Sequence, residues 1–181
     1  MPRYAAFLRG VNLGSTRKVS GAELCSMFED LGLEEVASFR NSGNVAFSAH
    51  RAPAAALAAR IEEAVAATLG FESAVMVRGA GQMRALAGHE PFGPALRERS
   101  KGKLQVMLLA RRPSAALREE ALALAREGDP LAFGTSELFW LPSGGMRDSK
   151  LDVRHLERLL APTTMRTMGT IEQMTAKFFA A

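Results

Sequence analysis

The sequence has a single cysteine, Cys25, so an internal disulfide bond is excluded. Cys25 lies inside a predicted amphipathic helix, where a small buried thiol is a better interpretation than a reactive nucleophile. No apolar run is long enough to cross a membrane, and no signal-peptide pattern precedes the first predicted strand. These absences predict a soluble cytoplasmic protein without a membrane partner.

The residues needed for metal binding and for covalent catalysis are also missing. His50, His89 and His155 are far apart and do not have the spacing of metal ligands. The loop after the first strand lacks the Gly-Lys-Ser/Thr ending of a P-loop, and Arg84 stands where a dinucleotide-binding fingerprint needs its third glycine. No Ser-His-Asp or Cys-His set can be assembled. We therefore expect no metal and no cofactor, and whether the chain is an enzyme stays open.

Acidic residues are absent from the start of the chain. No Asp or Glu occurs before Glu23, whereas Arg3, Arg9, Arg17 and Lys18 all do. The whole chain carries 23 Lys and Arg against 19 Asp and Glu, a net charge of +4. This mild excess permits an anionic partner without requiring one, and each cation is alternatively an ordinary solvated surface charge.

The sequence does contain a regular alternation of strand and helix patterns. A capping box formed by Ser20 and Glu23 predicts the start of a helix that ends at Gly32. The first half predicts strands over residues 3–9, 35–39, 45–48 and 73–78, and helices over residues 20–32 and 53–69. This order, βαββαβ, is that of the ferredoxin-like plait, a split βαβ fold.

The second half predicts a similar order after a Pro- and Gly-containing connection over residues 89–100. The patterns favour strands over residues 103–110, 131–133, 137–141 and 163–167, and helices over residues 113–127, 149–160 and 171–179. We therefore predict an α+β protein with two ferredoxin-like, plait-like subdomains. The N-terminal subdomain covers residues 1–79, and the C-terminal subdomain, with its terminal helix, covers residues 80–181.

This topology predicts where a polar site lies. The third strand runs antiparallel to the first, so residues 10–14 and residues 41–44 meet at one edge of the sheet. The N-terminus of the first helix opens there with unpaired amides and a partial positive charge. We predict that this edge binds a small anionic or nucleotide-like ligand, or a nucleic-acid backbone. The candidate residues are Arg9, Lys18 and Arg40 for charge, Asn12, Ser42 and Asn44 for orientation, and Lys150 and Arg166 as a lid.

Typical binding of single-stranded RNA by stacked bases is not expected at this edge. Residues 40–47 resemble the longer signature of RNA-recognition motifs in their basic start, central glycine and Val-x-Phe ending. That signature needs exposed aromatic rings on which bases stack, and Ser42 and Asn44 stand at those positions. Contacts to a phosphate backbone through the cations of this edge stay possible; these are Arg9, Arg17, Lys18 and Arg40.

Two alternatives to ligand binding stay open. Asn12 and Asn44 can instead hold the loops together through hydrogen bonds from side chain to backbone. The protein is then an interaction module, either a monomer or a homodimer, with no ligand. The other alternative is a metal-independent enzyme that uses the same pocket for electrostatic stabilisation. Free Asn12 and Asn44 side chains that line a pocket favour the binding module or the enzyme, and side chains fully bonded to backbone favour the interaction module.

A set of motifs runs through most of the chain: residues 8–14 (LRGVNLG), Lys18, residues 42–47 (SGNVAF), residues 149–151 (SKL), and Thr164 with Arg166. Together they resemble a bacterial family known only as a domain of unknown function, DUF1697. The resemblance implies a two-part α+β fold and no established activity. In the C-terminal motif of this family, Asn-Trp-Asn usually stands where this chain has Thr167, Met168 and Gly169. The resemblance therefore implies that any site built on this motif is altered or lost here.

Overall fold

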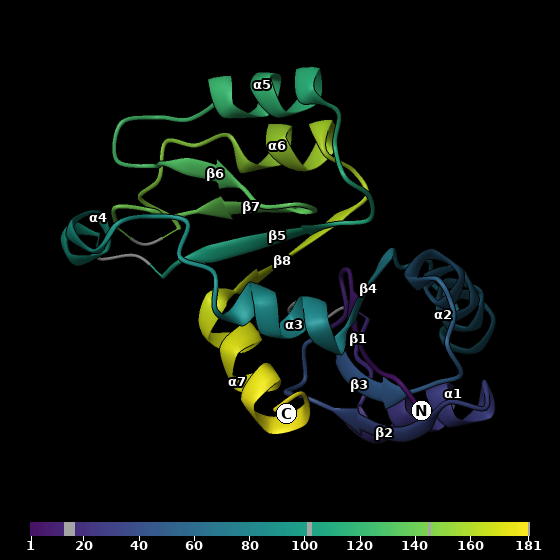
Figure 1. Ribbon diagram of the computed structural model, residues 1–181. Coiled ribbons are helices and arrows are strands. Elements are labelled where there is room, and N and C mark those ends of the chain that lie inside the picture. Colours follow the sequence, from purple (N-terminus) through teal and green to yellow (C-terminus); the bar gives the residue numbers. More distant parts are fainter. Residues whose placement is uncertain (13–16, 101–102, 145, 181) are drawn as a thin grey trace. The chain divides into compact units, whose positions relative to one another are not determined.

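The computed structural model describes residues 1–12, 17–100, 103–144 and 146–180 (Figure 1). The chain divides into two compact units. The first contains Met1–Leu86 together with the C-terminal residues from Met174 onward, and the second contains Ala87–Gln173. The sequence-based division between residues 79 and 80 stays a prediction.

The first unit has the element order predicted for a plait. Its strands are β1 (Arg3–Leu8), β2 (Glu34–Ser38), β3 (Asn44–Ser48) and β4 (Val75–Gly79), and its helices are α1 (Gly21–Asp30), α2 (Ala54–Leu69) and α3 (Ala80–Ala87). The sheet order is β2-β3-β1-β4, with every neighbouring pair antiparallel. The capping box is confirmed, because the Ser20 side chain accepts from the Glu23 amide and the Glu23 carboxylate accepts from the Ser20 amide.

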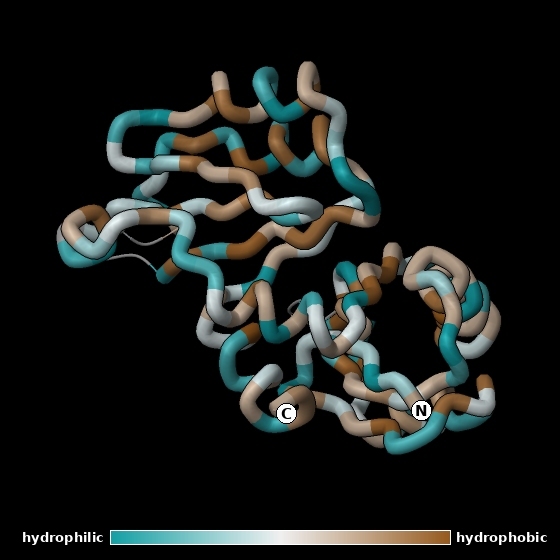
Figure 2. The backbone as a smooth tube through the Cα atoms, viewed as in Figure 1, coloured by the Kyte–Doolittle hydropathy of each residue, from teal (hydrophilic) through white to brown (hydrophobic). Residues whose placement is uncertain are grey.

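One face of this sheet packs against α1 and α2. Strand residues alternate in direction, so Tyr4, Ala6 and Leu8 of β1 join the same buried cluster as Phe28 of α1 and Ile61 of α2. Figure 2 shows apolar residues along the strands and on the helices of this unit. Burial of each large side chain contributes roughly 1.5–3 kcal/mol, so this cluster is the main stabilising feature of the first unit.

The second unit repeats the topology of the first. Its sheet contains β5 (Gln105–Leu109), β6 (Leu131–Phe133), β7 (Glu137–Trp140) and β8 (Thr163–Thr167) in the order β6-β7-β5-β8. Helices α5 (Ala115–Ala123) and α6 (Val153–Leu159) lie on one face of this sheet (Figure 1). The predicted α+β fold with two plait-like parts is thereby confirmed.

Two further helices lie outside the βαββαβ order of the plait. Helix α4 (Pro94–Arg99) lies inside the stretch that the sequence predicted as an irregular connection. Pro94 stands in its first turn, where the missing amide hydrogen and the fixed φ of proline are compatible with a helix. Helix α7 (Met168–Phe178) begins directly after β8, and its residues from Met174 onward belong to the first unit.

Candidate functional site

The structure brings the two predicted loops of the first unit together at the edge where β1 ends and β3 begins. Phe7 pairs with Asn44 in the antiparallel register, and the Leu8 amide donates to the Gly43 carbonyl at 2.8 Å. Gly43 has a φ of +71°, and an added Cβ atom would lie 3.0 Å from the Leu8 carbonyl oxygen and 3.2 Å from the Val11 Cβ. The close contact between the loops therefore depends on a glycine at this position.

Asn12 closes the loop between β1 and α1. Its side-chain Nδ2 donates to the Val19 carbonyl at 2.8 Å, and its Oδ1 accepts from the Val19 amide at 2.8 Å. The Asn12 amide also donates to the Arg17 carbonyl at 3.1 Å. Gly14 and the other residues between positions 12 and 17 lie outside the described residues. The Asn12 side chain therefore ties together the two ends of this loop.

Asn44 does the same for the turn between β2 and β3. It is fully buried, and its Nδ2 donates to the Phe39 carbonyl at 3.1 Å and to the Ser42 Oγ at 2.9 Å. The Phe39 amide in turn donates to the Asn44 carbonyl at 2.8 Å. Asn44 and Ser42 thus hold the turn in place, which is the structural alternative to ligand orientation.

The cations of this edge are presented by the same two loops. Arg17, Lys18 and Arg40 are exposed, and Arg9 is half-buried. The Arg17 guanidinium lies over the Phe71 ring at 5.1 Å from its centroid, and that of Arg40 lies over Phe39 at 5.5 Å. In the part of the chain that the structure describes, neither Arg17 nor Lys18 forms an ion pair. We refer to Arg9, Arg17, Lys18 and Arg40 as the cationic rim.

Left-handed backbone conformations are concentrated in these loops. Among the described residues, three of the four non-glycine residues with positive φ lie here: Asn12 at 56°, Arg17 at 51° and Arg40 at 56°. A left-handed L-residue costs roughly 1–2 kcal/mol relative to the right-handed region. Such strain persists only where surrounding contacts enforce it, and it is frequent at functional sites.

The N-terminus of α1 is already occupied by the protein itself. Glu23 accepts a hydrogen bond from the Ser20 amide at 2.7 Å, and this bond lowers the pKa of Glu23 below its ordinary value. The carboxylate therefore stands close to the positive end of the helix dipole. An anion bound at this edge would depend on the cationic rim more than on the helix terminus.

Lys150 and Arg166, the predicted lid residues, belong to the second unit. Lys150 is exposed and precedes α6. The Nη1 atom of Arg166 donates to the Thr164 Oγ1 at 2.9 Å and to the Met165 carbonyl at 2.7 Å. Burial lowers the pKa of Arg166 to about 10. The role of these two residues as a lid stays a prediction.

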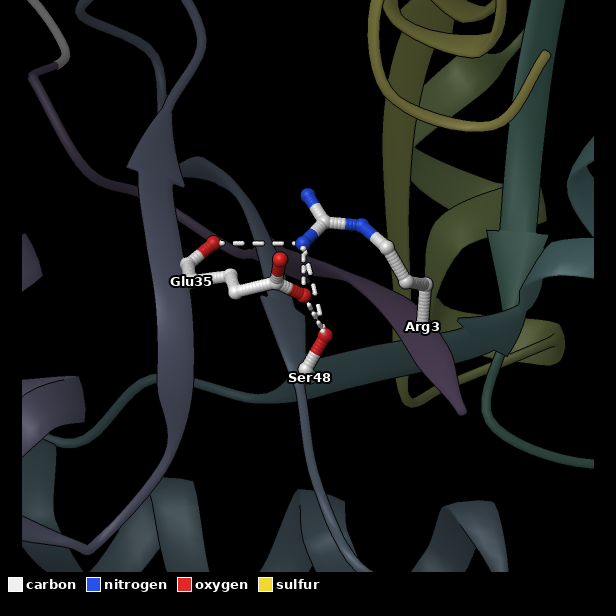
Figure 3. Close-up of polar contacts among 3 residues, drawn as sticks. All are labelled: Arg3, Glu35 and Ser48. Atoms are coloured by element: carbon white, nitrogen blue, oxygen red, sulfur yellow. Dashed lines mark hydrogen bonds and ion pairs between the residues drawn. The ribbon is translucent and has the colours of Figure 1, made fainter. Parts of the chain in front are cut away.

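A polar cluster that no sequence motif indicated lies at the opposite end of the β1–β3 pair (Figure 3). Arg3 Nη1 contacts the Glu35 Oε2 at 3.0 Å and the Ser48 Oγ at 3.3 Å, and the Ser48 hydroxyl donates to the same Glu35 oxygen. The hydrogen bonds from Ser48 and Arg3 lower the pKa of Glu35. Glu35 has a φ of +48° at a register shift in the edge strand β2. Arg3 and Ser48 fall opposite each other in the observed β1–β3 register.

The cluster of Arg3, Glu35 and Ser48 includes a residue of the edge strand β2 and has features that protect such a strand from pairing with another strand. A bulge and charged side chains on an edge strand are common devices that prevent another strand from pairing with it. The cluster contains a carboxylate, a hydroxyl and a guanidinium, and Arg3 holds the carboxylate in its charged form. A charged, hydrogen-bonded carboxylate with a depressed pKa is a poor general base near neutral pH.

The second face of the first sheet is not an open platform for nucleotide bases. Ala5, Phe7 and Ala46 point away from α1 and α2, and all three are fully buried. At the end of β2, the Phe39 ring packs edge-to-face on Phe178 of α7 with 6.0 Å between ring centroids. Base stacking of the RNA-recognition type needs exposed rings on this face. The described residues of this face therefore do not provide such a platform.

Two further properties concern the described residues as a whole. Within them, no group of three or more His, Cys, Asp or Glu side chains is placed so that it could hold a metal ion. None of the helices in that part of the chain combines the length and the apolar character needed to cross a bilayer.

The comparisons with known proteins agree with the fold. The structure is similar to that of the conserved bacterial protein SP0830 from Streptococcus pneumoniae, with a TM-score of 0.73 and 25% sequence identity. The alignment covers 96% of this chain and 98% of that chain. No curated protein matches the sequence. The family model described as "protein of unknown function (DUF1697)" matches residues 1–139, which leaves the motifs at residues 149–151 and 164–170 outside the match. Since the match spans well over half of the chain, this protein belongs to the DUF1697 family.

Proposed function

We propose that the first unit is a binding module for a phosphate-bearing anion, which contacts the cationic rim. The observation that carries the proposal is the exposure of Arg17 and Lys18, which have no ion-pair partner among the described residues. No acidic residue precedes Glu23 in the chain. Uncompensated cations on loops held in left-handed conformations form a pre-organised surface for an anion. The ligand class is a small nucleotide-like molecule or a nucleic-acid backbone.

The proposed roles of the candidate residues differ from one another. The cations Arg9, Arg17, Lys18 and Arg40 supply the ligand contacts. Asn12, Ser42 and Asn44 were predicted to orient the ligand, but their hydrogen bonds within the protein support a role in holding the two loops. In the proposal, these residues act on the ligand indirectly, because they fix the backbone from which the cations project. A cytoplasmic location is part of the same proposal.

The test is a thermal-shift screen of the full chain against ATP, pyrophosphate, short single-stranded RNA and short duplex DNA, at low and at moderate salt. A rise in Tm with one small molecule that persists at moderate salt identifies a specific ligand. A rise with nucleic acid that disappears as salt increases identifies contacts to the phosphate backbone. If none of these probes raises Tm at either salt concentration, the proposal is wrong.

The position of the site is tested by a matched pair of variants. The double variant R17A/K18A removes two cations from the cationic rim, and R111A/R112A removes two exposed cations from the second unit. We expect the first to abolish the ligand-induced shift and the second to leave it intact. R111A/R112A should keep the Tm of the free protein, because exposed charges contribute little to stability. R17A/K18A should lower Tm only slightly, since it also removes the contact of Arg17 with the Phe71 ring, which contributes about 0.5–1 kcal/mol at an exposed site. Equal effects of the two variants on binding would show that the anion binds elsewhere.

A protein-interaction module is the second candidate function. It is supported by the engagement of Asn12 and Asn44 with the backbone, which is the arrangement expected if the loops serve structure alone. Size-exclusion chromatography with light scattering tests its simplest form, a homodimer. A mass of two chains that reverts to one in R17A/K18A would place the interface at the cationic rim. A single-chain mass at all concentrations would exclude self-association.

A further inference from the structure

The second unit contains a groove that plays no part in the proposed function. Its volume is about 370 Å³, within the range typical of sites for small molecules. Leu96 of α4, Pro130 and Leu141 provide apolar surface, and Leu141 is almost completely buried. This lining can accept an apolar group of a ligand.

Among the lining residues that the structure describes, one charge of each sign lies at the rim of the groove. Arg126 and Glu127 are consecutive, exposed residues that both line the groove, as does Ser143. The Arg126 Nη1 donates to the neighbouring Ala125 carbonyl at 3.1 Å. Within the described ranges, neither Arg126 nor Glu127 forms an ion pair. A ligand with a carboxylate and an ammonium group would complement both charges, whereas a ligand with one charge would leave the other unpaired.

The turn that carries these charges is firmly anchored. The Asp129 amide donates to the Arg126 carbonyl at 2.9 Å, which closes the turn. The buried Asp129 carboxylate accepts from the Trp140 Nε1 at 2.8 Å and from the Ser149 Oγ at 2.8 Å. Ser149 also accepts from the Leu151 amide at 3.0 Å. Asp129 thus fastens the turn to β7 and to the segment that precedes α6.

The fit of this turn against the far side of the groove requires a glycine. Gly128 has a φ of +81°, and an added Cβ atom would lie 3.0 Å from the Ser143 Oγ. The Ser100 hydroxyl donates to the Pro142 carbonyl and thereby joins the end of α4 to the same segment. Pre-ordered walls reduce the entropy lost when a ligand binds.

We propose that this groove binds a small zwitterion with an apolar side chain, of the class of free α-amino acids. The ligand carboxylate pairs with Arg126, its ammonium group pairs with Glu127, and its side chain contacts Leu96, Pro130 and Leu141. The Ser143 hydroxyl lines the same groove and can accept from the ammonium group or donate to the carboxylate. This site is independent of the cationic rim, so each proposal can fail without the other.

The probe for the test is L-phenylalanine, added to the isotopically labelled full chain and followed by amide NMR spectra. Three comparison compounds each lack one feature: 3-phenylpropanoate has no amine, 2-phenylethylamine has no carboxylate, and glycine has no apolar side chain. We expect L-phenylalanine to shift the amides of Gly128 and Ser143, and each comparison compound to bind at least about tenfold more weakly. No shift at these amides up to about 10 mM would overturn the proposal, as would equal binding of any comparison compound.

Variants of Arg126 and Glu127 test whether these two groove residues contact the ligand. R126Q and E127Q should each raise the Kd for L-phenylalanine by about tenfold, and R126K, which keeps the charge, should raise it less. R112Q and E120Q change exposed residues of the same unit outside the groove and should leave the Kd unchanged. The amide spectra of each variant also report directly that it is folded. An unchanged Kd in both R126Q and E127Q would show that the groove is not the site.

Discussion

The two units share one topology down to individual backbone hydrogen bonds, but they present their cations at the corresponding edges on loops of different length and conformation. At the end of β1, Leu8 donates to Gly43 and Arg9 donates to Ala74. At the end of β5, Leu109 donates to Ser136 and Ala110 donates to Pro162 in the same pattern. Phe7 pairs with Asn44 as Leu108 pairs with Glu137. The plait topology therefore sets the backbone arrangement at both edges, and the residues of the connecting loops set the side chains presented there.

The difference between the edges lies in the length and conformation of the connecting loops. Residues 9–20 connect β1 to α1, whereas residues 110–114 connect β5 to α5. The longer loop has room for the left-handed Asn12 and Arg17 and for exposed Lys18. Both loops end in the same way, with Ser20 and Ser114 each accepting from an amide three residues later. The shorter loop also carries two exposed cations, Arg111 and Arg112, so the edges differ in loop length and in left-handed backbone conformation rather than in the presence of cations.

The substitution with the largest expected effect removes the buried amide that holds the first edge. N44A deletes the hydrogen bonds to the Phe39 carbonyl and to Ser42 inside the protein, and leaves a cavity. We expect it to lower the free energy of unfolding by about 2 kcal/mol, measured by urea denaturation. E137A at the corresponding position of β7 should cost less, since Glu137 is only half-buried. Equal losses would mean that the two edges are held by equivalent interactions.

The next effect concerns the backbone of the same turn. G43A places a Cβ atom at a φ of +71° and 3.0 Å from the Leu8 carbonyl oxygen, so we expect a loss of about 1–2 kcal/mol. Circular dichroism during thermal unfolding measures the change in Tm. G169A in the second unit is the matched control, because an added Cβ there meets no atom within 4 Å. If G43A is as stable as the control, the loop contact is more adaptable than its geometry indicates.

The smallest effect is a pH dependence that belongs to the first unit. Folding lowers the pKa of Glu35 below its ordinary value of 4.5, chiefly through the hydrogen bond from Ser48 and then through Arg3. The charged carboxylate therefore stabilises the folded state above that ordinary value, and the contribution disappears as the pH falls through the lowered pKa. We expect E35Q to lower Tm slightly at pH 7 and to leave it unchanged at about pH 2. A Tm difference that is the same at both pH values would assign the effect of E35Q to packing.

Much of the fold could be predicted because its signals are local. The helix start at Ser20 followed from its capping box with Glu23, and the strand order followed from the sequence of elements. Helix α4 was missed, since a short helix that starts with Pro94 resembles an irregular Pro- and Gly-containing connection. The topology alone predicted that residues 10–14 and residues 41–44 meet at one edge of the sheet, and the structure pairs Phe7 with Asn44 at that edge.

The position of the candidate site could be predicted from the sequence, but its side-chain hydrogen bonds could not. The sequence by itself determined two plait-like units, the edge at which two polar loops meet, and the excess of cations there. Only the tertiary structure decided that Asn12 and Asn44 bond within the protein, that Arg3, Glu35 and Ser48 form a cluster, and that Asp129 anchors a turn through Trp140 and Ser149. The physical reason is that side-chain hydrogen bonds are short and directional. Their partners are set by packing between segments distant in sequence, which no local pattern encodes.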